Sequence, residues 1–199
     1  MRKAIAMRSA LAAAVLMGAA STARAQSFES PQRVDTTVSL ERGGTLSVSV
    51  WSGRVNVSAG SGSSVHVRGT VERDAMQLRA RSSGVSISME SERRHGGRAE
   101  LDITVPEGTD VVLEGYSAPY VIQGVKGGVK AESLSGGIRV SDAAGRVMLE
   151  TVSGNIDVTK VDGDVRAESV NGTQTITDIA GDIECESVSG TVSISRAKS

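Results

Sequence analysis

The residue types that most often carry catalysis are scarce in this chain of 199 residues. Histidine occurs only at His66 and His95, and Cys185 is the single cysteine. No G-x-S-x-G, H-E-x-x-H or phosphate-binding Walker motif is present. We therefore predict that the protein is not an enzyme and uses no cofactor. The less favoured alternative is a carbohydrate-active β-helix enzyme, a class that usually combines longer coils with clusters of acidic and basic catalytic residues.

Acidic side chains near the C-terminus form the one weak candidate for a metal site. Asp182, Glu184 and Glu186 alternate along the chain, so a strand would place them on one face. Carboxylates in that pattern favour weak binding of a divalent cation or of a basic partner. A solvated edge is the simpler interpretation, because the same glutamate position recurs every eighteen residues, at Glu114, Glu132, Glu150, Glu168 and Glu186.

The elements that would position these residues are repeats. Glycine recurs every nine residues from 127 to 190, and the fuller unit has eighteen residues, as in Thr151 to Glu168, TVSGNIDVTKVDGDVRAE. Around each glycine the pattern is apolar-x-Gly-x-apolar-x-apolar, which predicts a turn followed by a strand with one buried face. The glycine serves either a positive φ or a close backbone approach.

Two such strands per unit predict a parallel β-solenoid with eighteen-residue coils over residues 114–199, preceded by an irregular antiparallel β region over 26–113. Inward side chains then stack into ladders. Cys185 falls in one ladder and is expected to be a small core residue, and Gln174 is a polar intruder in another. A calcium-binding β-roll would need an aspartate where these units carry apolar residues, so calcium-dependent folding is the lesser alternative.

The N-terminal half reads as less regular β-structure. Residues 34–40 and 45–50 are expected to form a hairpin, and Trp51 to Val57 follows the rule of the repeats, as a first rung. Residues 74–81 are the one stretch suited to a short helix. The basic cluster Arg93, Arg94, His95 and Arg98 is expected in a solvated hairpin loop between strands 85–90 and 100–105, with a phosphate or lipopolysaccharide contact as the alternative.

The first 25 residues have the features of a secretory signal peptide. Basic residues precede a short apolar run, and Ala23-Arg24-Ala25 supplies the small residues of a cleavage site. Removing this segment changes the formal net charge from −1 to −5, because it carries four basic residues and no acidic ones. We therefore expect an exported protein, periplasmic, secreted or at the cell surface, that binds no nucleic acid. No later run is long enough to span a membrane.

The order of segments resembles a known family. An irregular β half is followed by LDITVPEGTDVVLE, from Leu101 to Glu114, and then by tandem S-V-S-G-x-I-x-V units. This resembles the bacterial putative-adhesin family of unknown function that carries β-strand repeats, over roughly residues 35–195. The resemblance implies an exported, non-enzymatic β-solenoid that acts as a binding or structural module of the cell envelope. A periplasmic envelope-stress or assembly accessory that binds a protein partner is the alternative.

The last rung is expected to end near Ser195 with an uncovered strand edge. Such an edge pairs readily with another chain, so we expect self-association or a partner strand at this rung. The sequence does not identify a small-molecule ligand.

Overall fold

The computed structural model describes residues 31–72, 75–90 and 97–195, and these form sixteen β-strands and no helix. The predicted signal peptide lies outside the described residues. The strands are β1 (Gln32–Ser39), β2 (Thr45–Gly60), β3 (Ser64–Val71), β4 (Ala75–Arg81), β5 (Gly84–Glu90), β6 (Arg98–Pro106), β7 (Asp110–Ser117), β8 (Tyr120–Gln123), β9 (Val129–Ser133), β10 (Ile138–Ala143), β11 (Val147–Ser153), β12 (Ile156–Val161), β13 (Val165–Asn171), β14 (Gln174–Ile179), β15 (Ile183–Ser189) and β16 (Val192–Ser195).

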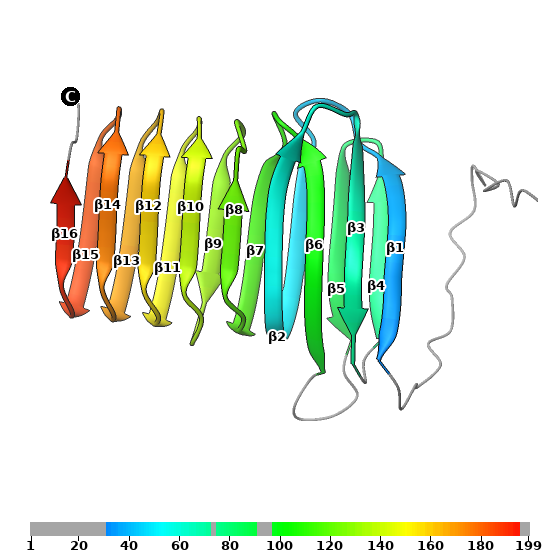
Figure 1. Ribbon diagram of the computed structural model, residues 1–199, viewed down its shortest axis with the longest axis horizontal. Coiled ribbons are helices and arrows are strands. Elements are labelled where there is room, and N and C mark those ends of the chain that lie inside the picture. Colours follow the sequence, from blue (N-terminus) through cyan, green and yellow to red (C-terminus); the bar gives the residue numbers. More distant parts are fainter. Residues whose placement is uncertain (1–30, 73–74, 91–96, 196–199) are drawn as a thin grey trace, which may run out of the picture.

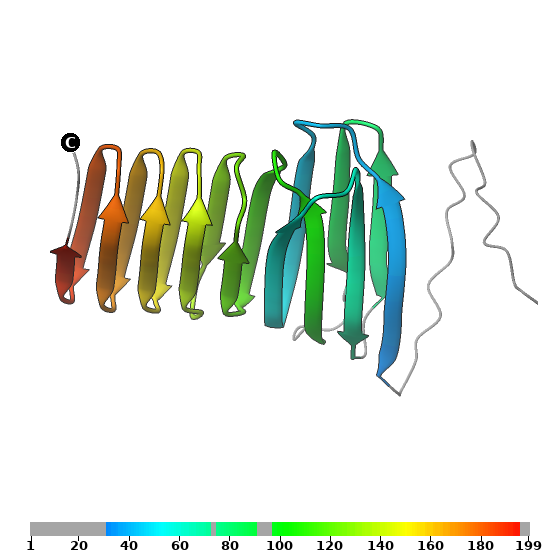
Figure 2. The ribbon, with the colours of Figure 1, turned by 45° about the horizontal axis from the view of Figure 1, so that its top comes forward.

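The second half of the chain is a parallel β-solenoid, as the repeats predict. Strands β7, β9, β11, β13 and β15 form one face, here called the glutamate face, and β8, β10, β12, β14 and β16 form the opposite, threonine face (Figures 1 and 2). Neighbouring strands pair in parallel at an offset of eighteen residues, as in Ile138 with Ile156 and Val147 with Val165. Each coil therefore contributes one strand to each face.

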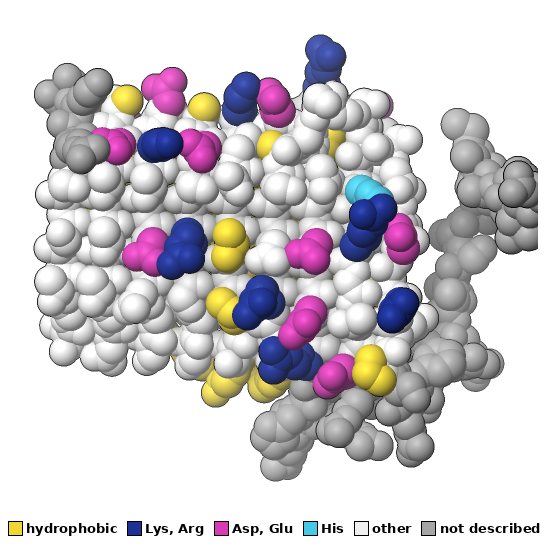
Figure 3. Space-filling model, viewed as in Figure 1, with side chains coloured by type: hydrophobic (Ala, Val, Ile, Leu, Met, Phe, Trp, Pro, Cys, Tyr) yellow, Lys and Arg dark blue, Asp and Glu magenta, His cyan; other side chains and the backbone are white. Residues whose placement is uncertain are grey.

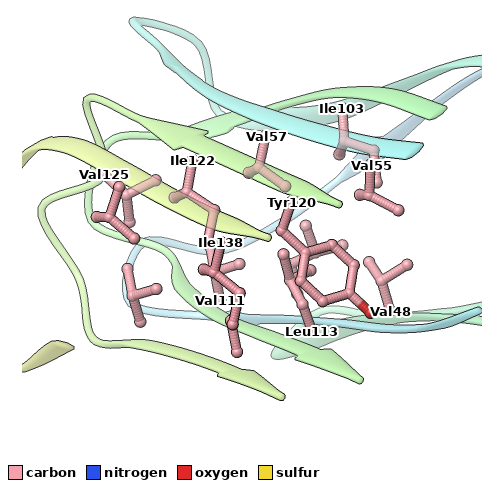
Figure 4. Packing of buried hydrophobic residues seen from close by; sticks show 14 of the residues in the cluster. Val48, Val55, Val57, Ile103, Val111, Leu113, Tyr120, Ile122, Val125 and Ile138 are labelled. Carbon is pink, nitrogen blue, oxygen red and sulfur yellow. The ribbon is translucent and has the colours of Figure 1, made fainter. Parts of the chain in front are cut away.

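The core between the faces consists of the predicted ladders. Ile122, Val140, Val158 and Ile176 are aligned in register and almost fully buried. Each such side chain contributes roughly 1.5–3 kcal/mol through burial. Figure 4 shows the first coils, where Tyr120 lies among aliphatic side chains from both faces. Apolar stacking therefore holds one coil on the next.

Glycines at both corners permit close contact between successive coils. An added Cβ at Gly154 would lie 2.1 Å from the carbonyl oxygen of Gly136, and one at Gly163 would lie 2.4 Å from the carbonyl oxygen of Gly145. Neither residue has a positive φ. Of the two reasons for glycine that the sequence leaves open, close backbone approach is therefore the one that applies at these positions.

One rung of the solenoid is a single long strand, β2, the first rung in the order of the sequence. Its first half pairs with β7, and its second half crosses to the threonine face and pairs with β8. Val55 and Val57 align with Tyr120 and Ile122, which confirms that Trp51 to Val57 forms a rung. The same sheet continues past residue 114 without a break.

Another rung precedes β2 in space although it follows β2 in the sequence. Strand β5 pairs in parallel with the first half of β2, and β6 pairs in parallel with the second half. The expected hairpin between β5 and β6 is therefore wrong, because the two strands lie on different faces. Arg98 begins β6 and pairs with Glu100, whereas Arg93, Arg94 and His95 lie outside the described residues.

The expected hairpin over 34–40 and 45–50 is also wrong. Strand β1 pairs antiparallel with β3, not with β2. The Leu40 amide donates to Ser63 O and the Glu41 amide donates to Ser82 O. The turn between β1 and β2 therefore carries the chain from the threonine-face side to the glutamate face. Alternation identifies a half-buried strand but does not identify its partner.

Residues 75–81 form strand β4, so the expected short helix over 74–81 is wrong. β4 pairs antiparallel with β5, and Met76 and Leu78 pack against the core. Their spacing of two residues suits a strand, and the available pairing edge of β5 outweighs the helical propensity of this segment. The antiparallel strands β1, β3 and β4 complete the N-terminal end of the sheet, in agreement with the predicted antiparallel β region.

Candidate functional site: a corner groove and the last rung

The corner that joins the glutamate face to the threonine face through Gly136 and its equivalents carries a column of carboxylates. The five glutamates expected every eighteen residues lie in register on adjacent strands: Glu114, Glu132, Glu150, Glu168 and Glu186. We call them the glutamate column. Parallel pairing places successive members about 4.8 Å apart at the backbone.

A row of exposed apolar side chains runs beside the glutamate column. We call it the apolar ridge, and its members occupy equivalent positions on successive rungs: Trp51, Tyr116, Leu134, Val152, Val170 and Val188. Their exposed fractions run from 36% for Leu134 to 81% for Val188. Two further large apolar side chains are exposed among the described residues, and both are in the last rung. In Figure 3, hydrophobic side chains project at the lower edge, where this corner lies.

The aliphatic part of the ridge, from Leu134 to Val188, and the column line an open groove of about 910 Å³. Between them lie Ser133, Thr151 and Ser169, which are each 5% exposed. The Ser133 and Thr151 hydroxyls donate to the carbonyl oxygens of Ala118 and Gly136, each at 3.3 Å. The Ser169 hydroxyl accepts from Gln174, whereas the Ser187 hydroxyl in the last rung has no partner among the described residues. The floor of the groove is therefore polar and hydrogen-bonded internally except in the last rung, and the two walls differ in chemistry.

Trp51 and Tyr116 form the N-terminal end of the ridge. Their rings are stacked in parallel with centroids 4.7 Å apart. Each ring covers one face of the other, and each side chain remains more than a third exposed. Stacking of this kind adds roughly 0.5–1.5 kcal/mol beyond burial, and the pair lies on the ridge just beyond the residues that line the groove.

Two basic side chains lie along the glutamate wall. The Lys130 ammonium lies 2.6 Å from Glu132, and this hydrogen bond raises the pKa of Lys130. Arg166 contacts Glu168, Glu184 and Glu186, and its hydrogen bond to Glu168 contributes most to raising its pKa. Among the described residues, Glu114 and Glu150 have no ion pair. The wall therefore keeps unpaired negative charge.

The weak metal candidate Asp182, Glu184 and Glu186 is only partly brought together. Arg166 lies 2.7 Å from Glu184 and 3.9 Å from Glu186, so a positive charge already lies where a cation was expected. The Asp182 amide donates to Asp164 instead. The described residues contain no group of three potential metal ligands. A cation site at this strip remains a prediction.

The last rung, β15 and β16, has no strand on its outer side in the part of the chain that the structure describes. Val192 is 39% exposed and Ile194 is 48% exposed, although their equivalents in earlier rungs are buried. Cys185 continues its ladder as expected but is only half-buried, and this burial raises the pKa of its thiol. This rung therefore presents an incomplete core.

Gln174 connects this rung to the one before it. Its Nε2 donates to the Ser169 hydroxyl at 2.9 Å and to the Glu186 carbonyl oxygen at 2.7 Å, while its Oε1 has no partner among the described atoms. The polar intruder is thus partly satisfied by hydrogen bonds. It replaces apolar contact with a link across the core.

The one histidine that the structure describes, His66, lies on the threonine-face side, away from the groove. Its Nε2 is 2.8 Å from Asp35 Oδ1. That hydrogen bond, with smaller contributions from nearby Arg68, holds the pKa of the exposed Asp35 carboxyl below its ordinary value. His95 lies outside the described residues.

Sequence reasoning missed the apolar ridge as a surface feature. The second position of each unit, such as Val152, is apolar in the sequence, and the pattern around glycine does not separate it from the core positions. Alternation along the preceding strand does separate it, because Leu149 and Thr151 are buried and Val152 therefore faces outward. Trp51 and Tyr116 could also have been singled out from the sequence, because the chain has only four aromatic residues.

Comparison with known proteins gives matches only among solved structures. No family model and no curated protein sequence matches the chain. A putative cell adhesion protein from Clostridium sporogenes ATCC 15579 matches with a TM-score of 0.54 and 10% identity, covering 82% of this chain and 99% of that one. The likeness is one of fold. A putative adhesin from Bacteroides fragilis NCTC 9343 aligns with a TM-score of 0.37 and 10% identity, covering 86% and 99%.

The resemblance predicted from the repeats agrees with the first of these comparisons in fold, and that protein is described as a putative cell adhesion protein. Among the described residues, no helix is long and apolar enough to cross a membrane.

Proposed function

We propose that the protein is an exported, non-enzymatic binding module of the cell envelope, in the periplasm or at the cell surface. The observation that carries this proposal is the apolar ridge, which extends over six rungs at one corner. Contiguous exposed apolar surface with a polar rim is typical of interaction sites. The fold shared with a protein described as a putative cell adhesion protein, and the signal-like residues 1–25, support the same role.

Cell fractionation tests this proposal. The tagged full-length protein should leave the cytoplasm, and a fraction of it should sediment with envelope fragments. Val152→Ser combined with Val170→Ser should move that fraction to the soluble pool, because it removes two central members of the ridge. Val121→Ser, on the threonine face, is the matched control. Cytoplasmic retention of the parent would overturn export, and unchanged sedimentation of the ridge variant would overturn binding through the ridge.

A second candidate function, an assembly accessory that completes its last rung with a partner strand, is favoured by the exposed Val192 and Ile194. An added strand would cover both side chains and pair with the open edges of β15 and β16. Sedimentation at high concentration and crosslinking test this candidate. Val192→Lys with Ile194→Lys should abolish any association through the rung, and a strictly monomeric parent without a crosslinked partner would exclude it.

A further inference from the structure

We propose that the groove binds an amphipathic α-helix whose apolar stripe packs on the apolar ridge and whose lysine and arginine side chains face the glutamate column. This inference rests on the proposed function and names the kind of partner that the module takes. Three properties of the groove support it: the spacing of the ridge, the lack of free backbone hydrogen-bonding groups, and the negative charge of the column.

The spacing of the ridge matches a helix better than an extended chain. Rungs repeat at about 4.8 Å along the solenoid, and a helix presents an apolar stripe with a pitch of about 5.4 Å, a mismatch near 0.6 Å per rung. An extended segment along the same axis repeats its side chains every ~6.6 Å and loses register within two rungs. From Tyr116 to Val188 the ridge covers four rung spacings, about 19 Å, which corresponds to a helix of about 13 residues.

The backbone of the groove offers a partner few hydrogen bonds. Strands β9, β11 and β13 are each paired on both sides, and the groove runs across them. A partner in the groove therefore cannot add itself to the sheet as a strand. It must satisfy its own backbone groups, which a helix does internally.

The charge of the groove selects a cationic partner. Glu114 and Glu150 have no ion pair among the described residues, and the column as a whole contains five carboxylates beside Lys130 and Arg166. A second copy joined ridge to ridge would bring two such columns together, and an anionic lipid surface would also be repelled. Basic side chains flanking an apolar stripe would pair with the column at the rim of the contact.

The aromatic pair argues against a sugar as the main ligand. Carbohydrates pack on open ring faces, whereas Trp51 and Tyr116 cover one face of each other and the remaining ridge residues are aliphatic. The pair instead continues the apolar ridge beyond the N-terminal end of the groove. Trp51 is also the only tryptophan of the chain, so its fluorescence reports on the part of the ridge next to that end.

Two synthetic peptides of identical composition test the inference. Both contain about 14 residues of leucine and lysine, one with leucine at helical spacing and the other with strict alternation. Neither contains tryptophan, so Trp51 fluorescence of the mature protein, without residues 1–25, measures binding. Calorimetry measures it independently. We expect the helical peptide to bind at least about tenfold more tightly than the alternating one, and to gain helical circular dichroism on binding.

Matched variants then locate the contact. Val152→Ser with Val170→Ser should weaken binding of the helical peptide by about tenfold. Glu114→Gln with Glu150→Gln should weaken it less, and should reduce its dependence on salt concentration. On the threonine face, Val121→Ser and Asp157→Asn should leave the affinity unchanged. Melting curves of all four variants confirm that the fold is intact.

Each other outcome overturns the inference in a distinct way. Tighter binding of the alternating peptide, with the same dependence on the ridge, would show that the corner binds extended segments, and the proposed function would stand. Equal loss of affinity in the threonine-face controls would show nonspecific attraction to an acidic protein. If neither peptide binds, the helix proposal fails, and the fractionation experiment decides separately whether the module binds the envelope through this ridge.

Discussion

The two corners of the solenoid share one structural requirement but differ in the residues that they expose. Both rely on glycines that let one coil lie against the backbone of the next. At the corner of Gly136 the preceding strand places an apolar side chain outward on each rung, and the positive φ values found there among the described residues are at the glycines Gly53 and Gly172. At the corner of Gly145 the chain turns through positive φ at Gly124 and at three residues that carry side chains, Asp142, Lys160 and Asp178.

The difference shows that the residues at the Gly145 corner are constrained by backbone conformation. Left-handed φ values of 54°, 56° and 57° at Asp142, Lys160 and Asp178 reflect a tight bend, and aspartate tolerates that conformation better than most residues. Nothing comparable requires an exposed valine or leucine before Gly136. The apolar ridge is therefore a surface property that folding does not demand.

The largest expected effect comes from filling the close approach between coils. Gly154→Ala places a Cβ 2.1 Å from the Gly136 carbonyl oxygen and should lower the free energy of unfolding by about 3 kcal/mol or more. Gly163→Ala, at 2.4 Å from Gly145 O, should cost a similar amount at the other corner. Gly108→Ala, with open space around its Cβ, is the control. Denaturant unfolding measures all three, and a neutral Gly154→Ala would contradict the coil spacing.

Tyr120→Phe should stabilise the protein by about 1–2 kcal/mol, because it removes a buried hydroxyl that has no partner among the described residues. Burial, and secondarily Glu114, raises the pKa of Tyr120. The unfolded chain therefore releases this proton at about pH 10, while the folded protein keeps it, so stability falls as pH rises beyond that value. Unfolding of the parent and the variant between pH 8 and about 11 should show the advantage of Phe growing with pH; a constant difference would contradict the burial.

Lys160→Gly should stabilise the corner of Gly145 by up to about 1 kcal/mol, because a lysine pays roughly 1–2 kcal/mol for its left-handed conformation, partly offset by the greater chain entropy of glycine. The ion pair of Lys160 with Asp142, at 3.8 Å and largely exposed, is a small loss. Thermal melting checks this. A lower melting temperature in Lys160→Gly, with Thr159→Gly as the control for entropy alone, would count against the strain.

The smallest effect concerns the predicted cation strip. Glu184→Gln with Glu186→Gln removes two exposed partners of Arg166, so the melting temperature in metal-free buffer should fall slightly. If the strip binds calcium, millimolar calcium should raise the melting temperature of the parent and leave the double variant unchanged. Identical responses of the two proteins to calcium would leave Arg166 as the only cation that these glutamates bind.

The solenoid was predictable because its signal is repeated. Each inward position recurs at eighteen residues, so Val158 and Ile176 identify one ladder without knowledge of any other contact. The glutamate column follows from the same arithmetic. When each unit pairs only with its neighbours, the repeat length in the sequence directly gives the pairing register of the strands.

The N-terminal rungs and the groove were not predictable in that way. Strand β5 follows β2 in the sequence but precedes it in the stack, and β1 pairs with β3 across an intervening strand. Alternation carries no information about such partners. Val152 is exposed because it alternates with the buried Thr151, and a polar threonine is not marked as inward by the apolar pattern.

The position of β2 in the stack determines the order in which the molecule can assemble. β2 is held between β5–β6 on one side and β7–β8 on the other, so it is completed only after the chain as far as Gln123 is available. From there, each additional eighteen residues join an edge that already exists. Duplication or loss of one unit beyond β8 therefore changes the length of the rod, and with it the reach of the groove, without disturbing the residues that start it.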